Sequence, residues 1–324
     1  MKRNIIKAVG AAGIAGLIGL TACMMTGHRD STAVVAETPV VASFTNSPPV
    51  PSSIRFCGKS IDLTRYNSYE GIDRELCGFA YLHSTTMMLI KRANRYFPVI
   101  EPILSANGIP DDFKYLAVIE SSLDPTAVST ARAVGLWQLL EGTGKQYGLR
   151  ITTTVDERRN VAKSTQAACK YLNEAYRKYG DWITVASSYN AGMGRITTQM
   201  DKQGVESSLD LYLLEETTRY PYRIFAVKLI FENPYKYGFI IHADNLYKPF
   251  EYQERTVNSD IPDLAAFAQE NGVTFKDLKI FNPWLRDDKL LTDGASYTIL
   301  IPKTNQMKYG GSPRYVHDER WVVQ

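Results

Sequence analysis

The sequence predicts a mainly α-helical protein that ends in a small α+β module. From Ser84 to Tyr237, apolar residues recur at helical spacing, with interruptions at Pro and Gly, and the alternating pattern of strands is almost absent. After Tyr237, β-branched and aromatic runs surround a short helical stretch. The 324 residues are 44% hydrophobic and 22% charged, which suits two folded units and excludes a wholly disordered or fibrous chain.

Residues 1–22 have the pattern of a secretion signal. A basic start precedes an apolar run from Ala8 to Leu20, which is shorter than the roughly 20 apolar residues that span a bilayer. Leu20-Thr-Ala-Cys23 resembles the bacterial lipobox, in which the signal is cut before the cysteine and the sulfur is acylated. We therefore expect Cys23 to carry a lipid anchor, the alternative being an ordinary signal peptide with an incidental cysteine.

Residues 23–55 are expected to form a flexible tether, because they are rich in Thr, Ser, Val and Pro and have no helical period. The helical unit is expected over residues 56–245, with its core at 95–240. One of its helices is marked by an apolar stripe at three- and four-residue steps that begins at Val161 and ends at Tyr179. Gly180 should end this helix, and Asp181 should cap the next one, from Trp182 to about Tyr189.

Another expected helix carries an acid on its apolar face. Pro110 and Asp111 open it, and Phe113, Leu116, Ala117 and Glu120 follow at i, i+3, i+4 and i+7. Desolvation there should raise the pKa of Glu120 from roughly 4.3 towards the working pH, as a general acid requires. A structural Glu that pairs with an Arg or caps a backbone group is the alternative from periodicity alone.

Several motifs in fixed order decide between these interpretations. From about residue 95 to 240 the chain resembles the soluble lytic transglycosylase domain, in particular its membrane-bound type D branch. The resemblance rests on the following segments: Glu120-Ser-Ser-Leu-Asp-Pro125, Ser129, Gly135-Leu-Trp-Gln138, Val155-Asp-Glu-Arg158, Ala167-Ala-Cys-Lys-Tyr-Leu172, Tyr179-Gly-Asp-Trp182, Ser188-Tyr-Asn-Ala-Gly192 and Glu216-Thr-Thr-Arg-Tyr220.

The resemblance implies a lysozyme-like α-helical fold with a glycan-binding groove and Glu120 as the catalytic residue. The residues that it assigns to substrate binding are Ser121, Ser129, Gly135, Gln138, Tyr189, Asn190, Glu216 and Tyr220. Among them, the Tyr189 hydroxyl could hold Glu120 or a sugar, and Gln138 offers a donor and an acceptor to an N-acetyl group. Glu216 and Tyr220 would support the site from the last helix.

The family's reaction cleaves the β-1,4 bond between N-acetylmuramic acid and N-acetylglucosamine and forms 1,6-anhydromuramyl products. One acid suffices, because an intramolecular hydroxyl replaces the external nucleophile, whereas a hydrolase normally needs a second carboxylate. Glu141, which stands where the family often has Pro, makes a lysozyme-like muramidase the rival enzyme. A catalytically silent peptidoglycan-binding lipoprotein is the rival from another class. Arg132, where Gly is common, could cancel the pKa shift of Glu120.

Residues 250–303 resemble a degenerate LysM module, a small βααβ unit that binds N-acetylglucosamine polymers, and 304–324 are expected to be a tail. Asn282-Pro283 and the stretch from Gly294 to Pro302 match, whereas Asn258-Ser-Asp260 replaces the usual entry motif. Whether this module binds glycan or is a structural appendage stays open at this point.

The remaining features bear on partners and cofactors. The net charge of +3 gives no indication of nucleic-acid binding. The four histidines lack metal spacing, and we expect neither metal nor cofactor. Cys57 and Cys77 are candidates for a disulfide, and Cys169 for a buried thiol. We expect a monomer in the cell envelope, lipid-anchored, on the outer membrane facing the periplasm, with peptidoglycan strands as its partner.

Overall fold

The computed structural model describes residues 46–309 and 314–323. The predicted signal, Cys23 with its expected lipid anchor and most of the tether lie outside the described residues. Within the described residues, no helix is both long and apolar enough to cross a membrane.

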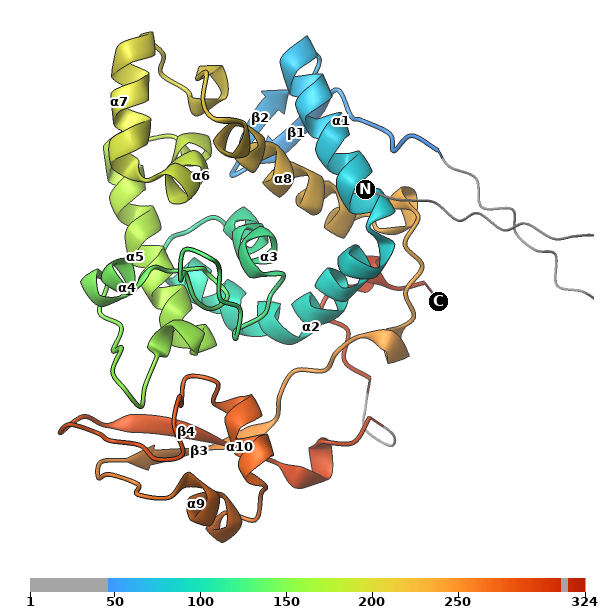
Figure 1. The fold of residues 1–324 in the computed structure, drawn as a ribbon. Helices are drawn as coiled ribbons and strands as arrows, with labels where there is room; N and C mark the ends of the chain where they lie inside the picture. Colours follow the sequence, from blue (N-terminus) through green and yellow to red (C-terminus); the bar gives the residue numbers. More distant parts are fainter. Residues whose placement is uncertain (1–45, 310–313, 324) are drawn as a thin grey trace, which may run out of the picture. The chain divides into compact units, whose positions relative to one another are not determined.

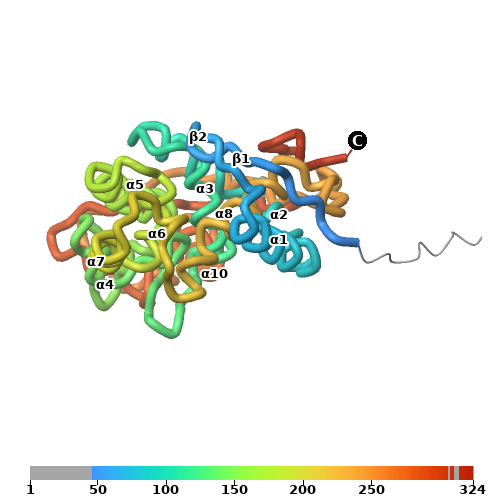
Figure 2. Tube along the Cα trace, turned by 90° about the horizontal axis from the view of Figure 1, so that it is seen from above, coloured from blue at the N-terminus to red at the C-terminus, as the bar shows by residue number. Residues whose placement is uncertain are grey.

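The expected helical unit is present and begins with a small antiparallel hairpin (Figure 1). In both views α1 lies towards one end of this unit, while α5, α6 and α7 gather at the other (Figures 1 and 2). Its elements are β1 (Ser53–Phe56), β2 (Lys59–Asp62), α1 (Tyr66–Tyr81), α2 (His83–Ala106), α3 (Lys114–Ser121), α4 (Glu141–Gln146), α5 (Val161–Tyr179), α6 (Trp182–Ala191), α7 (Met193–Gln203) and α8 (Glu215–Glu232).

The chain is folded earlier than the expected boundary at residue 55. That boundary lies inside β1, where Ile54 is 4% exposed and Phe56 is 1% exposed. Ile54 and Phe56 stand two positions apart in the strand, so their side chains point to the same side and join the core of the helical unit. This short strand was missed from the sequence because the segment before residue 53 is rich in Pro.

The helix α5 and its end follow the prediction. Its buried stripe includes Ala168 and Leu172, and Gly180 adopts the left-handed conformation that ends the helix. The Asp181 carboxylate accepts a hydrogen bond from the backbone N–H of Thr184 at 3.0 Å and so caps α6.

The C-terminal module has the predicted βααβ order. It consists of β3 (Tyr252–Val257), α9 (Leu264–Glu270), α10 (Phe275–Phe281) and β4 (Tyr297–Pro302). The two strands pair antiparallel with Tyr252 opposite Pro302. A separate hydrophobic core lies beneath them, and Val155 from the helical unit is fully buried in that core.

The loop before α5 joins the two modules by backbone hydrogen bonds. The Asp156 N–H donates to the Trp284 carbonyl at 2.8 Å, and the Arg286 N–H donates to the Thr154 carbonyl at 2.9 Å. These bonds, with the burial of Val155, fix the LysM-like module against the helical unit by main-chain contacts.

The expected tail returns to the helical unit. Trp321 is 3% exposed, and its indole N–H donates to the Phe231 carbonyl of α8 at 3.0 Å. The imidazole Nε2 of His317 lies 2.9 Å from Glu101 Oε2, and its backbone N–H donates to Asn94 of α2. Residues 314–323 therefore pack against this unit, with Trp321 in its core.

The three cysteines of the described chain are free thiols, so the expected Cys57–Cys77 disulfide is absent from this structure. Cys57 lies in the turn between β1 and β2, where its backbone N–H donates to Asp112, and Cys77 lies on α1. Cys169 is fully buried, as predicted, and burial raises its thiol pKa to about 12.

Candidate active site

Glu120 lies in the last turn of α3, which packs against α2 and α8 in the interior of the helical unit (Figure 1). Leu116 and Ala117 are fully buried, as their spacing predicted. Immediately after Glu120 the chain turns sharply, because Ser122 and Leu123 both have a φ of 56°. The carboxyl group therefore lies at the point where a buried helix ends.

Burial raises the pKa of Glu120 to about 7. A hydrogen bond from the Tyr220 hydroxyl to Glu120 Oε1 and the positive charge of Arg223 lower the pKa, and the negative charge of Glu216 raises it. Desolvation dominates, as expected from the apolar face. At neutral pH the group is thus close to half protonated, which permits both donation and acceptance of a proton.

The groups that act on Glu120 come from one face of α8. Glu216, Tyr220 and Arg223 stand at i, i+4 and i+7, so they share a side of the helix. Tyr220 is 2% exposed and burial holds its pKa well above the ordinary value, so it remains a neutral donor. The sequence identified Glu216 and Tyr220 but missed Arg223, which its helical spacing from Tyr220 could have indicated.

Arg132 was named from the sequence as a charge that could oppose the pKa shift of Glu120, and the structure shows that Arg223 is the positive charge that lowers this pKa. Arg132 is an exposed residue in the left-handed conformation within the loop after α3. Because the loop turns back, the position of Arg132 in the sequence did not show which Arg side chain lies near Glu120.

Tyr189 bonds to the protein backbone. Its hydroxyl donates to the Trp137 carbonyl at 2.7 Å, while the bond to Glu120 comes from Tyr220. The negative charge of Glu120 contributes to the raised pKa of Tyr189, so this ring nevertheless lies near the acid. Asn190 accepts a hydrogen bond from Thr217 at 3.1 Å and thereby ties α6 to α8.

The other four predicted binding residues shape the loop beyond α3. Ser121 donates to the Leu136 carbonyl at 2.9 Å, and Ser129 accepts from the Ala133 N–H at 3.1 Å. Gln138 Nε2 donates to the Gly135 carbonyl at 2.9 Å, which leaves its Oε1 without a partner among the described residues.

Gly135 is required by packing. Its φ is +84°, and a Cβ there would lie 2.0 Å from the Arg158 carbonyl oxygen. The residue thus holds the loop close to the segment that precedes α5.

Glu141 does not act on Glu120. It is exposed at the start of α4 and forms an ion pair with Lys145 at 2.7 Å, which lowers its pKa. The carboxylate whose charge acts on Glu120 is Glu216. Within the part of the chain that the structure describes, no three His, Cys, Asp or Glu side chains gather as metal ligands.

A cleft of about 550 Å³ lies between α1, α2, α3 and α8, and Glu120 itself is not part of its lining. Ile119 and Ser122, on either side of Glu120 in the chain, line it, as do Glu216 and Arg223. Glu75, which is 4% exposed, accepts a hydrogen bond from Arg219 Nε at 2.6 Å within the same wall. Two of the charged groups in this lining, Glu216 and Arg223, act on the pKa of Glu120.

Two family models match this chain. Residues 99–210 match the transglycosylase SLT domain, and residues 253–305 match the soluble lytic transglycosylase C-terminal LysM-like domain. The first range contains α3 with Glu120 and the loop that follows, and the second contains the βααβ module.

Known proteins match over parts of the chain. Membrane-bound lytic murein transglycosylase D of Escherichia coli K12 is 30% identical over 69% of this chain and 49% of the relative. Peptidoglycan transglycosylase gp16 of Escherichia phage T7 is 35% identical over 31% of this chain and 8% of the relative. The crystal structure of the 70 kDa soluble lytic transglycosylase of Escherichia coli gives a TM-score of 0.37 at 22% identity, over 42% of this chain and 24% of that one.

The chain spans about half the length of the first of these relatives. Two matched domains in the same order as the helical unit and the βααβ module nevertheless agree with the fold. The chain thus carries a transglycosylase SLT domain at residues 99–210, followed by a LysM-like domain of the soluble lytic transglycosylase type at residues 253–305.

Proposed function

We propose that this chain is a peptidoglycan lytic transglycosylase that uses Glu120 as its single acid and base. The observation that carries the proposal is a carboxyl group with a pKa of about 7 at the end of a buried helix, hydrogen-bonded by Tyr220 and influenced by the charges of Arg223 and Glu216. The SLT domain match and the name of the relative, membrane-bound lytic murein transglycosylase D, support the substrate class.

In the first step, protonated Glu120 gives its proton to the glycosidic oxygen, and the bond between the muramyl C1 and that oxygen breaks. Tyr220 donates to Oε1, which leaves Oε2 to carry the proton. In the second step the Glu120 carboxylate takes the proton of the muramyl 6-hydroxyl, whose oxygen closes on C1. No water enters, the acid returns to its starting state, and the product is a 1,6-anhydro sugar.

The pairing of Glu141 with Lys145 favours this reaction over hydrolysis. A muramidase that used Glu120 and Glu141 would need the second carboxylate free to activate water, whereas Glu141 is an exposed partner of Lys145 and adds nothing to the electrostatics of Glu120. Glu216 is exposed as well, in the first turn of α8, and we assign it to tuning the pKa of Glu120.

We infer that the remaining candidates bind the substrate or support the groups that do. Gln138 Oε1 is the free acceptor for an N-acetyl N–H, and Tyr189 and Ser121 hold the loop that presents it. We further infer that the chain works in the cell envelope, attached through acylated Cys23, because the lipobox-like sequence agrees with the membrane-bound name of the relative.

The test is digestion of purified, peptide-free glycan strands by wild type and Glu120→Gln, with products weighed by mass spectrometry. Wild type should give products one water lighter than hydrolysis products. Glu120→Gln should retain the fold but lose at least about a thousandfold of the rate, because the amide cannot transfer a proton. Hydrated reducing ends would instead identify a muramidase, and near-normal cleavage by the variant would remove Glu120 from the mechanism.

A further inference from the structure

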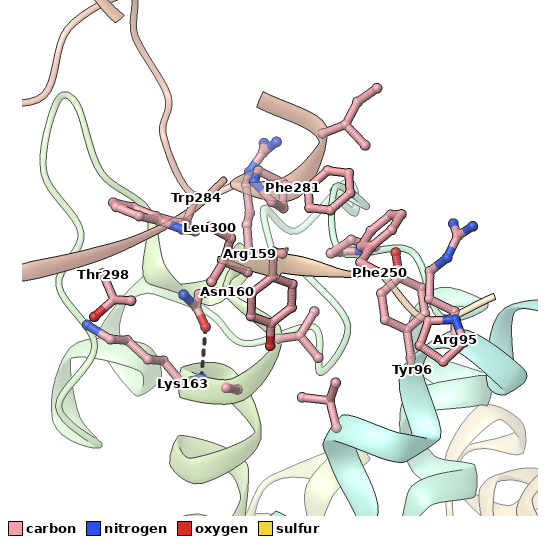
Figure 3. A pocket seen from close by; sticks show the side chains of 18 of the residues that line it. Arg95, Tyr96, Arg159, Asn160, Lys163, Phe250, Phe281, Trp284, Thr298 and Leu300 are labelled. Carbon is pink, nitrogen blue, oxygen red and sulfur yellow. Dashed lines mark hydrogen bonds between the residues drawn. The ribbon is translucent and has the colours of Figure 1, made fainter. Parts of the chain in front are cut away.

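A second cavity, of about 300 Å³, lies between the LysM-like module and the start of α5 (Figure 3). Aromatic and apolar groups of the module form much of its wall, among them Phe250, Phe281, Trp284 and Leu300. The opposite wall comes from α2 and from residues 159–163 at the start of α5. None of the groups that act on Glu120 lines this cavity, so it is separate from the candidate active site.

Two buried hydrogen-bond donors in its wall have no partner within the described residues. They are the indole Nε1 of Trp284 and the Nε of Arg159. Trp284 is 2% exposed, its ring stacks on Tyr297 at 5.4 Å, and its carbonyl is fixed by the Asp156 N–H. A buried donor without an acceptor is unfavourable, because it has lost its hydrogen bonds to water without replacement. A rigid ring that keeps such a donor in a cavity wall indicates a ligand with acceptor atoms.

The start of α5 favours an anion in the same cavity. Asn160 caps this 19-residue helix by accepting a hydrogen bond from the Lys163 N–H at 3.0 Å, and Val161 and Ala162 of the first turn line the cavity. A helix N-terminus carries about half a positive charge and attracts anions. In Figure 3 the side chains of Asn160 and Trp284 lie on the same side of the cavity, with Lys163 below them.

Further positive charge surrounds an adjoining hollow of about 830 Å³, which shares Arg95 and Arg159 with the cavity. Lys276, Lys279 and Arg286 also line it, and the acids in the two walls are Asp124 and Glu254.

These five cations lack a salt bridge within the described part of the chain. Arg95, Lys279 and Arg286 donate to backbone carbonyls instead. Burial lowers the pKa of Lys279, and repulsion from Arg159 adds to this against the attraction of Asp287. Positive side chains thus cluster here without acidic partners to neutralise them, as in anion-binding sites.

We propose that this cavity binds the stem peptide of peptidoglycan, with a stem carboxylate held by Arg159, the indole N–H of Trp284 and the start of α5. The proposal rests on the function proposed above, since the stem is part of that substrate. Alanine side chains of the stem suit the aromatic wall of Phe250 and Phe281, and its carboxylates match the unpaired cations. An uncharged stretch of N-acetylglucosamine would leave those cations unmatched.

The test uses the full chain with Glu120→Gln, which removes cleavage, and measures calorimetric binding of a soluble stem tripeptide with free carboxylates. The same tripeptide with amidated carboxylates is the second probe. The acidic tripeptide should bind at least about tenfold more tightly than the amidated one, since a charge-assisted bidentate contact is worth more than 1.4 kcal/mol. Arg159→Gln and Trp284→Phe should each remove most of that preference. The matched control is Arg177→Gln, an exposed cation in the last turn of α5.

Equal binding of the two tripeptides, or a preference that survives both Arg159→Gln and Trp284→Phe, would overturn the site. Thermal melting of each variant separates loss of binding from loss of fold. Cleavage of peptide-free glycan by the wild-type chain tests the proposed function independently. If wild type cleaves this glycan while the Glu120→Gln chain does not bind the acidic tripeptide, the stem site fails and the transglycosylase stands. Tripeptide binding without glycan cleavage rejects the transglycosylase alone.

Discussion

Tyr220→Phe isolates the hydrogen bond that holds the acid. The substitution removes only the hydroxyl that donates to Glu120 Oε1 and keeps the buried ring. This bond stabilises the charged carboxylate and opposes the effect of burial on the Glu120 pKa, which is about 7 with the bond in place. Without it, desolvation acts with less opposition, so the pKa should rise.

The size of the effect follows from the strength of such bonds. A hydrogen bond to a charged group contributes about 1.5–3 kcal/mol, and about 1.4 kcal/mol changes a pKa by one unit. Because Glu120 must be protonated to start the reaction, its pKa sets the alkaline limb of the activity profile. Tyr220→Phe should therefore move that limb upward by about 1–2 pH units. The maximal rate should fall as well, because the carboxyl group loses its orientation.

The assay is the initial rate of anhydro-product formation from peptide-free glycan, measured across the pH range for wild type, Tyr220→Phe and Tyr222→Phe. Tyr222 is the matched control, because it lies two residues further along α8, is 5% exposed and bonds Ser68 at 3.3 Å rather than Glu120. The alkaline limb of the Tyr222→Phe activity profile should stay at the wild-type pH. An unmoved limb in Tyr220→Phe, or one displaced to lower pH, would refute the assignment of this bond.

The raised pKa of Glu120 also predicts how the free energy of unfolding depends on pH. A carboxyl whose pKa rises from 4.5 to about 7 on folding binds its proton more tightly in the folded state, so the free energy of unfolding falls as the pH rises through that window. The loss is at most roughly 3 kcal/mol, because partial exposure of Glu120 screens the charge. Glu120→Gln should remove this part of the pH dependence, which denaturant titrations at several pH values would measure.

Three further predictions concern other parts of the chain. Glu216→Gln should move the alkaline limb of the activity profile to lower pH, because the charge of Glu216 raises the Glu120 pKa. The control is Glu215→Gln, which should leave this limb in place because Glu215 pairs with Arg side chains. A limb that moved to higher pH in Glu216→Gln would contradict the electrostatics. Trp321→Ala should lower the free energy of unfolding by about 3 kcal/mol, measured by denaturant titration, whereas a change below about 1 kcal/mol would mean that this segment does not stabilise the helical unit. Cys23→Ser should release the protein from membranes, and retention after a high-salt wash in cell fractionation would exclude the lipid anchor.

The sequence by itself determined the architecture, because its signals are local. The stripe on α5, the Gly that ends it and the Asp that caps α6 are each set by residues within a few positions of one another. The burial of Glu120 also followed from one helix, since its apolar neighbours lie one and two turns away on the same face. The βααβ order of the C-terminal module was predicted from the resemblance of its segments to a LysM module, and the structure has this order.

Only the tertiary structure decided which side chains meet around that acid. The bond to Glu120 comes from Tyr220, 100 residues away in sequence, while Tyr189 bonds to the Trp137 carbonyl. Which charge opposes the acid, Arg223 rather than Arg132, depends on how α8 packs against α3. The cavity beside α5 and the return of Trp321 to α8 arise in the same way, from packing between segments distant in the chain. Such contacts produce no periodic pattern in the sequence. They are set by the direction of the chain and the geometry of the loops, not by the conformational preferences of neighbouring residues.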